Sequence, residues 1–407
     1  MPTHALSPLL AARLDEMARG GRLKGREAVI RAIVPAAAGH GPRYLIEGED
    51  TPFLRMNSNG YLGMALRREV EAAEEAAVAR YGTGPGAVRF ISGTFSPHVE
   101  LERRLAAFHD RPAAMLFSSA YAAVMGLLPP LTTDKTAVIS DALNHNCIIN
   151  AIALARPAEK RIYKHLDMSE LERELEAASK ICARAIVVTD GIFSMRGDHA
   201  PLDKIMTLVH RYDAAFAENA ILIVDDSHGV GAFGATGRGT EEHTGSGPAD
   251  VLVATLGKAF GVNGGYIVAD ETVIRYLRET SPTYVYSNPI TPAEAAAAHK
   301  AIDMLDGAEG TALIAHLRAM TARFRAGLLE LGLETLPGEH PVVPLILRDT
   351  ARTSALVAHL RRRGILATGL AFPVVPRGDE EIRFQISADH TVADIDAALD
   401  AIASFAG

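Results

Sequence analysis

The chain has 407 residues, a formal net charge of −8 and a hydrophobic fraction of 48%. This composition excludes a disordered chain, and the negative charge argues against a nucleic-acid binder, which needs a basic face. The length exceeds what a single core usually holds, so we expect two linked lobes.

The sequence carries no pattern of secretion or membrane insertion. Its first 20 residues lack the uninterrupted apolar region of a signal peptide, and no apolar stretch reaches the roughly 18 residues that a membrane span needs. Cys147 and Cys182 lie far apart and match no disulfide or zinc pattern. We therefore expect a cytoplasmic protein with no membrane segment.

An amphipathic helix is predicted close to the N-terminus. Leu6, Leu9, Leu10, Leu14 and Met17 recur near helical spacing. Their apolar stripe is expected to pack on its own chain or on a partner subunit.

From about residue 98 onward, short apolar runs alternate with helical patterns such as 168–180. This order is typical of crossover units, and it predicts an α/β fold with a mostly parallel central sheet flanked by helices. Buried strands are expected at 113–117, 136–140, 184–190, 220–226, 251–256 and 265–270.

After about residue 290 the pattern changes to that of a smaller α+β domain, which the strand-like segment 43–48 is expected to join. We expect an N-terminal helix and small-domain segment over 1–56, a large ligand-binding domain over 57–290 and a C-terminal small domain over 291–407. Within the last, helices are predicted at 291–306, 312–331, 353–364 and 393–405, and strands at 341–347 and 380–387.

Ligands of open parallel sheets bind outside the carboxyl ends of the strands, so the polar residues that follow each predicted strand are candidates for the site. Five strand ends are expected to converge on one region. The residues there are Ser118, Ser119, Asp141, Asn144, His145, Asp190, Ser194, Asp225, Asp226, Ser227, His228, Thr255 and Lys258.

The segment 224–239 places two aspartates at a strand end, with His228 three positions after Asp225. Successive strand residues point to opposite faces, so only one of Asp225 and Asp226 can face a given ligand. The carboxylate suits a metal, a histidine or a cationic heterocycle. No HxxH or HExxH spacing supports a metal, so none is expected, whereas a structural Asp–His pair remains an alternative.

Lys258 follows the predicted strand 251–256 in a glycine-rich segment. The surrounding residues match neither the P-loop nor the dinucleotide fingerprint, so a phosphate-binding lysine is disfavoured, although a surface or ion-paired lysine stays possible. A partly desolvated amine becomes nucleophilic and suits imine chemistry.

Pyridoxal phosphate accounts for the other residues of this region, because its ring nitrogen needs a carboxylate and its phosphate needs helix N-termini and hydroxyls. Asp225 meets the first need. Ser119 and the amides of Ala120 and Tyr121, at a predicted helix start, meet the second. Further donors are Ser194, Thr255, Ser287 and Asn288.

A set of motifs in chain order resembles the α-oxoamine synthases, which are fold-type I pyridoxal-phosphate enzymes, and the resemblance runs from about residue 40 to the C-terminus. The motifs are NSNGYLGM, VRFISGTFSPHVELE, FSSAY, SDALNHNCIINAI, TDGIFSMRG, VDDSHGVGAFGATGRG, TLGKAFG, YSNPITP and FPVVPRGDEEIRFQISADHT.

The resemblance implies roles for the cofactor-binding residues. Lys258 would bind the cofactor covalently and later remove the α-proton of the amino acid, while Asp225 would pair with the ring nitrogen. His228 would hydrogen-bond the phenolic oxygen and His145 would stack on the ring. Ala120, Tyr121, Ser194 and Thr255 would contact the phosphate and cofactor, with Ser287 and Asn288 supplied by the neighbouring subunit of a homodimer.

Substrate contacts follow from the same resemblance. Arg383 would clamp the amino-acid carboxylate, with Asn59 as a second contact, although a salt bridge from Arg383 to Glu380 or Glu381 is the alternative. From their position alone, and not from the resemblance, Arg22 and Lys24 are expected to meet the phosphates of coenzyme A.

The motifs SDALNHNCII, TDGIFSMRG and FPVVPRG are most similar to the glycine C-acetyltransferase branch. This implies condensation of glycine with acetyl-CoA to 2-amino-3-oxobutyrate, or the reverse reaction in threonine breakdown. Branches of the 8-amino-7-oxononanoate synthase, 5-aminolevulinate synthase and serine palmitoyltransferase type are the near alternatives. A dinucleotide-dependent oxidoreductase and a noncatalytic cofactor-binding protein are more remote.

Overall fold

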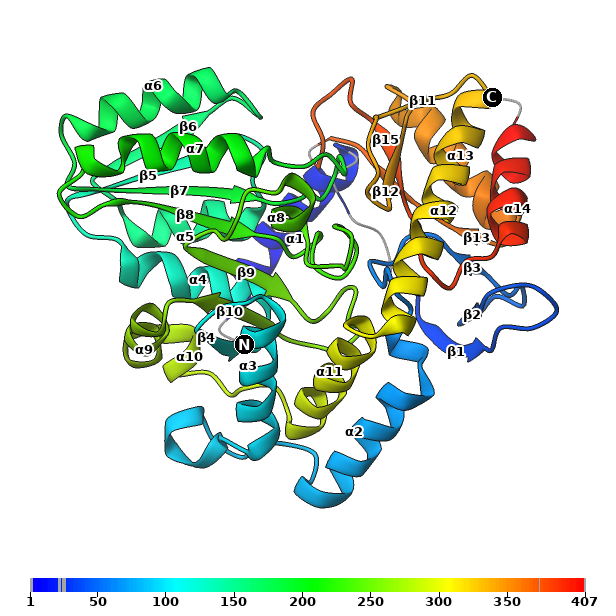
Figure 1. Cartoon of the computed structure of the whole chain (residues 1–407). Coiled ribbons are helices and arrows are strands. Elements are labelled where there is room, and N and C mark those ends of the chain that lie inside the picture. Colours follow the sequence, from blue (N-terminus) through cyan, green and yellow to red (C-terminus); the bar gives the residue numbers. More distant parts are fainter. Residues whose placement is uncertain (1–2, 21–22, 24–26, 373, 406–407) are drawn as a thin grey trace.

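The computed structural model describes residues 3–20, 23, 27–372 and 374–405. Arg22 and Lys24, expected at the coenzyme A phosphates, lie outside these residues. Figure 1 shows two lobes, with a large twisted sheet in one and the C-terminal elements in the other.

The large lobe contains a seven-stranded sheet with the order β4-β10-β9-β8-β7-β5-β6. All neighbouring pairs are parallel except those of β10, which runs antiparallel to both β4 and β9. The strands are β4 (Ala113–Phe117), β5 (Thr136–Asp141), β6 (Glu159–Tyr163), β7 (Arg184–Asp190), β8 (Ala220–Asp225), β9 (Val251–Thr255) and β10 (Gly265–Ala269).

Two details of this sheet go beyond the sequence prediction. The connection 256–264 between β9 and β10 is too short for the dozen or more residues of a parallel crossover, so β10 turns back antiparallel. Strand β6 was not predicted, because its residues EKRIY lack an apolar run. Their charges are those of an edge strand, where β6 lies.

Alternate residues of the strands feed two apolar clusters, one on each face of the sheet, as the pleat requires. Helices α3 (Ser96–Phe108), α6 (Met168–Ser179) and α7 (Leu202–Tyr212) contribute to one cluster. Helices α4 (Ala120–Leu131), α5 (Asn146–Ala155) and α9 (Glu271–Thr280) contribute to the other. The predicted sheet with helices on both faces is therefore confirmed.

The second lobe is built around a four-stranded antiparallel sheet, ordered β11-β12-β15-β14. Its strands are β11 (Glu334–Thr335), β12 (Val342–Ile346), β14 (Thr368–Leu370) and β15 (Glu381–Gln385), and its helices are α12 (Ala308–Glu330), α13 (Thr350–Arg362) and α14 (Val392–Ala403). Helices α2 (Arg68–Tyr81) and α11 (Pro292–Leu305) lie where the lobes meet in Figure 1.

The segment 43–48 joins this second lobe, as predicted. Strand β2 (Arg43–Ile46) pairs with β1 (Ile30–Val34), and Tyr44 bridges to Phe53 beside β3 (Leu54–Arg55), which pairs with β13 (Ile365–Leu366). Ile46, Phe53 and Leu366 form a small core there. The exact domain boundaries stay a prediction.

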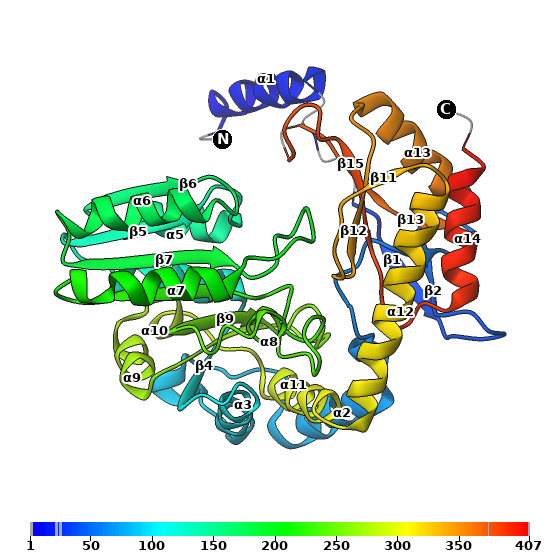
Figure 2. The ribbon, with the colours of Figure 1, turned by 45° about the horizontal axis from the view of Figure 1, so that its top comes forward.

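Helix α1 (Leu6–Arg19) forms where expected, and Figure 2 shows it apart from both lobes. None of its residues is buried, and its apolar stripe faces outward, with Leu9 64% exposed. The stripe is thus not covered by its own chain. Across the described ranges, no helix has the length and apolar character needed to cross a membrane.

Candidate active site

A cavity of about 230 Å³ opens at the carboxyl ends of the parallel strands. Side chains from the ends of β7, β8 and β9, from the turns that follow them, from the segment after β5 and from the start of α4 converge on it, as the sheet topology predicts. Its lining residues are Ser119, Ala120, Tyr121, His145, Cys147, Asp190, Ile192, Ser194, Asp225, Ser227, His228, Thr255 and Lys258.

Lys258 reaches this cavity from the turn after β9. Burial lowers the pKa of its amine to about 8, although the carboxylates Asp225 and Asp190 act in the opposite direction. Within the described part of the chain, no hydrogen bond or ion pair engages the amine. A lysine with a lowered pKa and no fixed partner is suited to act as a nucleophile.

The two aspartates at the end of β8 point to opposite sides, as strand alternation requires. Asp225 faces the cavity, and its Oδ1 accepts a hydrogen bond from the backbone N–H of Ser227 at 3.1 Å. Asp226 turns away, because its carboxylate accepts bonds from the backbone N–H (2.6 Å) and the hydroxyl (2.7 Å) of Thr240. Only Asp225 can therefore meet a ligand in the cavity.

His228 is held on two sides. Its Nδ1 lies 2.7 Å from the hydroxyl of Tyr61, and its backbone carbonyl accepts a hydrogen bond from Nε2 of His340 at 2.9 Å. Burial and the charge of Lys258 hold the pKa of His228 well below its usual range, so the ring is neutral. The ring therefore presents Nε2 to the cavity in a fixed orientation.

His145 caps helix α5, because its Nδ1 accepts a hydrogen bond from the backbone N–H of Cys147 at 3.3 Å. Its own backbone N–H donates to Asp190 at 3.0 Å. The thiol of Cys147 lies 2.9 Å from Nδ1 of His145 and 3.5 Å from Asp225. Helix capping therefore fixes the imidazole beside the cavity.

The start of α4 forms the anion-binding end of the cavity. Ser119 is the N-cap, and its hydroxyl accepts a hydrogen bond from the backbone N–H of Ala122 at 3.0 Å. The preceding amides of Ala120 and Tyr121 point beyond the helix end and are available to an anion, as in other helix N-termini. The ring of Tyr121 is held through its hydroxyl by Asn146 and Asn150 of α5.

Gly265, at the start of β10, allows this close approach. A Cβ there would lie 2.1 Å from the backbone nitrogen of Ala120, so Gly265→Ala is expected to displace the helix start. We expect weaker cofactor binding and a loss of about 1–3 kcal/mol of stability from overpacking. Cofactor titration and thermal unfolding measure both. Gly84→Ala, whose Cβ meets nothing within 4 Å, is the matched control, and equal behaviour of the two variants would contradict the prediction.

The cavity also contains residues to which the sequence analysis gave no role: Cys147, Asp190, Ile192 and Ser227. Asp190 and Ser227 were among the strand-end candidates, whereas Cys147 and Ile192 carry no polar signal in the sequence. The hydroxyl of Ser227 is buried with no hydrogen-bond partner, and burial raises the pKa of the Asp190 carboxyl. An unpartnered buried hydroxyl fits a polar ligand.

Arg383 comes from β15 of the second lobe and reaches across to the large lobe. Its Nη1 donates to the backbone carbonyl of Ser194 at 2.7 Å. When the side-chain amide of Gln385 is turned so that its oxygen faces the guanidinium, this oxygen accepts hydrogen bonds from Nε of Arg383 at 2.7 Å and from Nη2 at 2.6 Å. Glu380 instead contacts Gly378 and Thr350, and the described residues contain no ion pair from Arg383 to Glu380 or Glu381. The salt-bridge alternative for Arg383 is therefore wrong.

The remaining candidates either do not line the cavity or have their polar group bonded within the chain. Oδ1 of Asn59 lies 3.4 Å from the hydroxyl oxygen of Tyr61, and Asn59 does not line the cavity. Thr255 lines it, but its hydroxyl donates to the carbonyl of Gly264 at 3.1 Å. Ser287 and Asn288 follow α10 (Pro282–Val285) and do not line the cavity of their own chain.

Pyridoxal phosphate fits this set of residues. The free amine of Lys258, the carboxylate of Asp225 and the unpartnered hydroxyl of Ser227 face one cavity, which has a helix start at its anion-binding end. Among the described residues, no group of three or more histidine, cysteine, aspartate or glutamate side chains is arranged to hold a metal. The fold and this site are those of a fold-type I pyridoxal-phosphate enzyme.

Known proteins with similar sequences and structures bear this out. The family Aminotransferase class I and II matches residues 51–402. Human mitochondrial 2-amino-3-ketobutyrate coenzyme A ligase is 39% identical over 363 residues, covering 89% of this chain and 84% of the relative. The 8-amino-7-oxononanoate synthase of Thermosipho melanesiensis is 37% identical over 393 residues, 96% of each chain. The structure of Sphingomonas wittichii serine palmitoyltransferase matches with a TM-score of 0.85 at 27% identity, covering 99% of this chain and 97% of that one.

The chain belongs to the α-oxoamine synthase family of pyridoxal-phosphate-dependent enzymes. The family and cofactor predicted from the sequence motifs are confirmed, and the dinucleotide-dependent oxidoreductase is set aside.

Proposed function

We propose that this enzyme condenses glycine with acetyl-CoA to give 2-amino-3-oxobutyrate and coenzyme A. The observation that carries the proposal is the single cavity in which Lys258, without a fixed partner, faces Asp225 and His228. The similarity to 2-amino-3-ketobutyrate coenzyme A ligase supports the choice of glycine and acetyl-CoA. In the cleaving direction the same reaction would serve threonine breakdown.

Lys258, Asp225 and His228 would each have a separate role in this reaction. When bound, pyridoxal phosphate supplies an electron-poor ring that accepts the negative charge left by the departing α-proton. Lys258 would hold the cofactor and would then take that proton, for which a pKa of about 8 is well matched to neutral pH. Asp225 would keep the ring nitrogen protonated by charge pairing, and His228 would donate a hydrogen bond to the ring oxygen.

Arg383 and Asn59, neither of which lines the cavity, would position the amino-acid substrate. Arg383 would bind the glycine carboxylate through its planar fork of donors, with Asn59 as a second contact, and His145 would pack on the cofactor ring. Holding glycine and the thioester together makes the carbon–carbon bond formation effectively unimolecular.

A second candidate is an acyl transfer with a longer acyl chain or another amino acid. The 8-amino-7-oxononanoate synthase relative matches this chain at a similar identity and favours it. The test is a panel of amino acids crossed with acyl-CoAs, following coenzyme A release. Glycine with acetyl-CoA is expected to give the highest kcat/KM. Strong preference for alanine with a long acyl chain would overturn the acetyltransferase assignment, and preference for succinyl-CoA would move it to the aminolevulinate type.

We also propose a homodimer with shared active sites. The outward stripe of α1 and the exposed side chains of Phe90, Ile91 and Tyr286 leave apolar surface that a partner would cover. Ser287 and Asn288 lie near Tyr286 and outside their own cavity, so they are positioned to serve the site of the other subunit.

Sharing of the site predicts complementation between two inactive variants. Lys258→Ala and Asn288→Ala chains, expressed together, would form mixed dimers in which one of the two sites has both native residues. Roughly a quarter of wild-type activity is expected from random pairing in a twofold dimer. Steady-state assays of the separate and coexpressed variants measure it. Activity no higher than the mean of the two separate variants would show that Asn288 acts within its own chain.

A further inference from the structure

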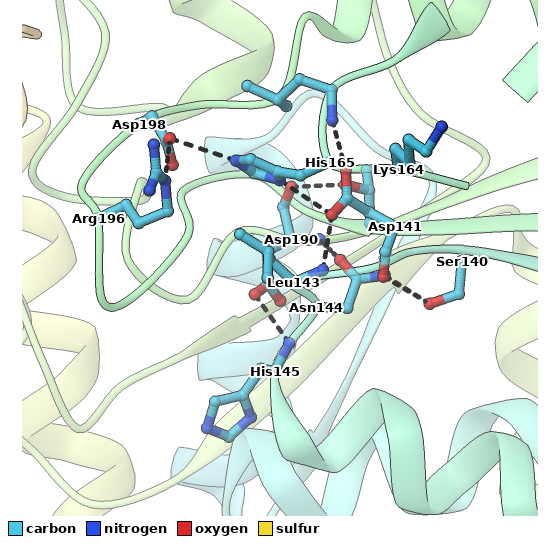
Figure 3. A network of polar contacts seen from close by, with 12 residues as sticks. Ser140, Asp141, Leu143, Asn144, His145, Lys164, His165, Asp190, Arg196 and Asp198 are labelled. Carbon is cyan, nitrogen blue, oxygen red and sulfur yellow. Dashed lines mark hydrogen bonds and ion pairs between the residues drawn. The ribbon is translucent and has the colours of Figure 1, made fainter. Parts of the chain in front are cut away.

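A doubly paired histidine lies behind the active site, in the network of Figure 3. His165 follows strand β6, and its Nδ1 is 3.0 Å from Oδ1 of Asp141 while its Nε2 is 3.2 Å from Oδ2 of Asp198. Because a carboxylate faces each ring nitrogen, both nitrogens must carry a proton to make these bonds. The ring is therefore an imidazolium held between two anions.

The first carboxylate ties the imidazolium to the turn that carries His145. Asp141 ends β5 and also accepts hydrogen bonds from the backbone N–H of Leu143 at 2.8 Å and of Leu166 at 3.0 Å. Three residues further on, Asn144 accepts a bond from the backbone N–H of Asp190 at 2.8 Å. The turn after β5 is thus bonded both to His165 and to the end of β7.

The second carboxylate ties the imidazolium to the turn after β7. Asp198 also accepts a bond from Nε of Arg196 at 2.7 Å, and its backbone carbonyl accepts one from the N–H of Phe193 at 3.0 Å. The ring of Phe193 meets the imidazole edge-on at 4.4 Å between centroids. His165 therefore contacts this turn at two residues, the carboxylate of Asp198 and the ring of Phe193.

Arg383 of the second lobe forms a hydrogen bond to this turn of the large lobe. The carbonyl of Ser194, one residue after Phe193, accepts the bond from Nη1 of Arg383 at 2.7 Å. Ser194 lines the cofactor cavity and also a second cavity of about 380 Å³, which His145, Met195 and Glu381 line as well. An unbroken series of contacts therefore runs from Asp141 through His165 and the turn to Arg383.

We infer that His165 is a positioning residue for Arg383: by holding the turn that carries the Ser194 carbonyl, it sets where the guanidinium meets the amino-acid carboxylate. This inference rests on the proposed function, because it takes Arg383 as the carboxylate-binding group. His165 itself does not line either cavity and acts only through the turn.

The charge of His165 has a defined pH range. Burial acts to lower the pKa of the ring, but the bonds and charges of Asp141 and Asp198 outweigh it and raise the pKa to about 9. The charged groups that face these two carboxylates include Arg196, which pairs with Asp198, Glu381, which also interacts with Asp198, and Asp190, which interacts with Asp141. A raised folded-state pKa means that the stabilisation is fully present below the ordinary value of 6.5 and is lost as the pH rises through about 9.

The test compares His165→Asn with the wild type as cofactor-loaded enzymes. Asparagine can still donate toward Asp141 but is too short to reach Asp198. We expect the KM for glycine to rise about tenfold, the scale of one charge-assisted hydrogen bond, with kcat changed less than about threefold. The visible absorption band of the bound cofactor is expected to stay unchanged. The excess stability of the wild type over the variant is expected to shrink between pH 7 and pH 10.

Two further variants make the result decisive. Asp198→Asn removes the same charge pair with little change of shape and is expected to raise the KM in the same way, so it replaces His165→Asn if that variant does not fold. His316→Asn removes a histidine that bonds only the backbone carbonyl of His390, and it is expected to leave the KM unchanged. An unaltered KM in both test variants, or a fall in kcat alone, would overturn the inference.

Failure of the proposed function is recognised separately. If the wild type transfers no acyl group to glycine, amino-acid binding is measured instead, through the spectral change of the cofactor band with a series of amino acids. A dissociation constant that rises about tenfold in His165→Asn still supports the positioning role. An unchanged constant overturns it, whatever the acyl donor proves to be.

Discussion

Replacement of Lys258 by alanine is expected to reduce acyl transfer by at least about 10³-fold, because it removes both the covalent anchor of the cofactor and the base that takes the α-proton. Among the described residues that line the cavity, Lys258 is the only lysine, and burial lowers the pKa of its amine to about 8. The visible absorption band of covalently bound cofactor should be absent in the variant. Steady-state kinetics and the absorption spectrum of the purified protein measure the two effects.

Two controls accompany the lysine experiment. Borohydride should abolish the band in the wild type, since it reduces an imine. Lys180→Ala removes an exposed lysine that pairs with Glu176 on α6, and it should leave the band and the turnover unchanged. Full turnover in Lys258→Ala would show that the covalent role is wrong.

Replacement of Asp225 by asparagine is expected to lower turnover by about 10²-fold or more, the scale of losing one electrostatic contact to charge that develops in the reaction. Asparagine keeps the shape but cannot hold a proton on the ring nitrogen by charge pairing. Asp225 is the one aspartate of β8 that faces the cavity. Kinetics together with a pH titration of the cofactor spectrum measure the change.

The adjacent residue provides a matched control for this experiment. Asp226→Asn makes the same substitution one position away, on the opposite face, where the carboxyl group is bonded to Thr240. It is expected to cost about 1–3 kcal/mol of stability through the lost buried bonds. The cofactor spectrum should not change. A spectral change of equal size in both variants would contradict the assignment of the ring nitrogen to Asp225 alone.

Much of the large lobe could be predicted from local patterns. Buried parallel strands are continuous apolar runs, so β5, β7, β8 and β9 were located to within a residue or so. Strand β6 was missed because an edge strand needs no apolar run. The antiparallel direction of β10 follows from its short connection to β9, and the predicted strands 251–256 and 265–270 already contain that length.

The residues of the site also fall into those that the sequence could predict and those that it could not. Lys258, Asp225 and His228 follow strands, so topology alone brings them together, and the motifs then assign their chemistry. Cys147 and Ile192 reach the cavity only because α5 and the turn after β7 close over it. Their side chains have no polar signal, so no sequence pattern could find them.

The sequence by itself determined the buried strands of the sheet, the strand ends that bear the candidate residues, and the family with its cofactor, because these depend on periodicity and on short motifs. Only the tertiary structure decided which partners hold those residues: the Tyr61 and His340 contacts of His228, the Ser194 carbonyl on Arg383, and the two carboxylates on His165. Each joins segments far apart in the chain, and their distances depend on how the two lobes and the neighbouring turns pack. Local propensity and spacing carry no information about such contacts.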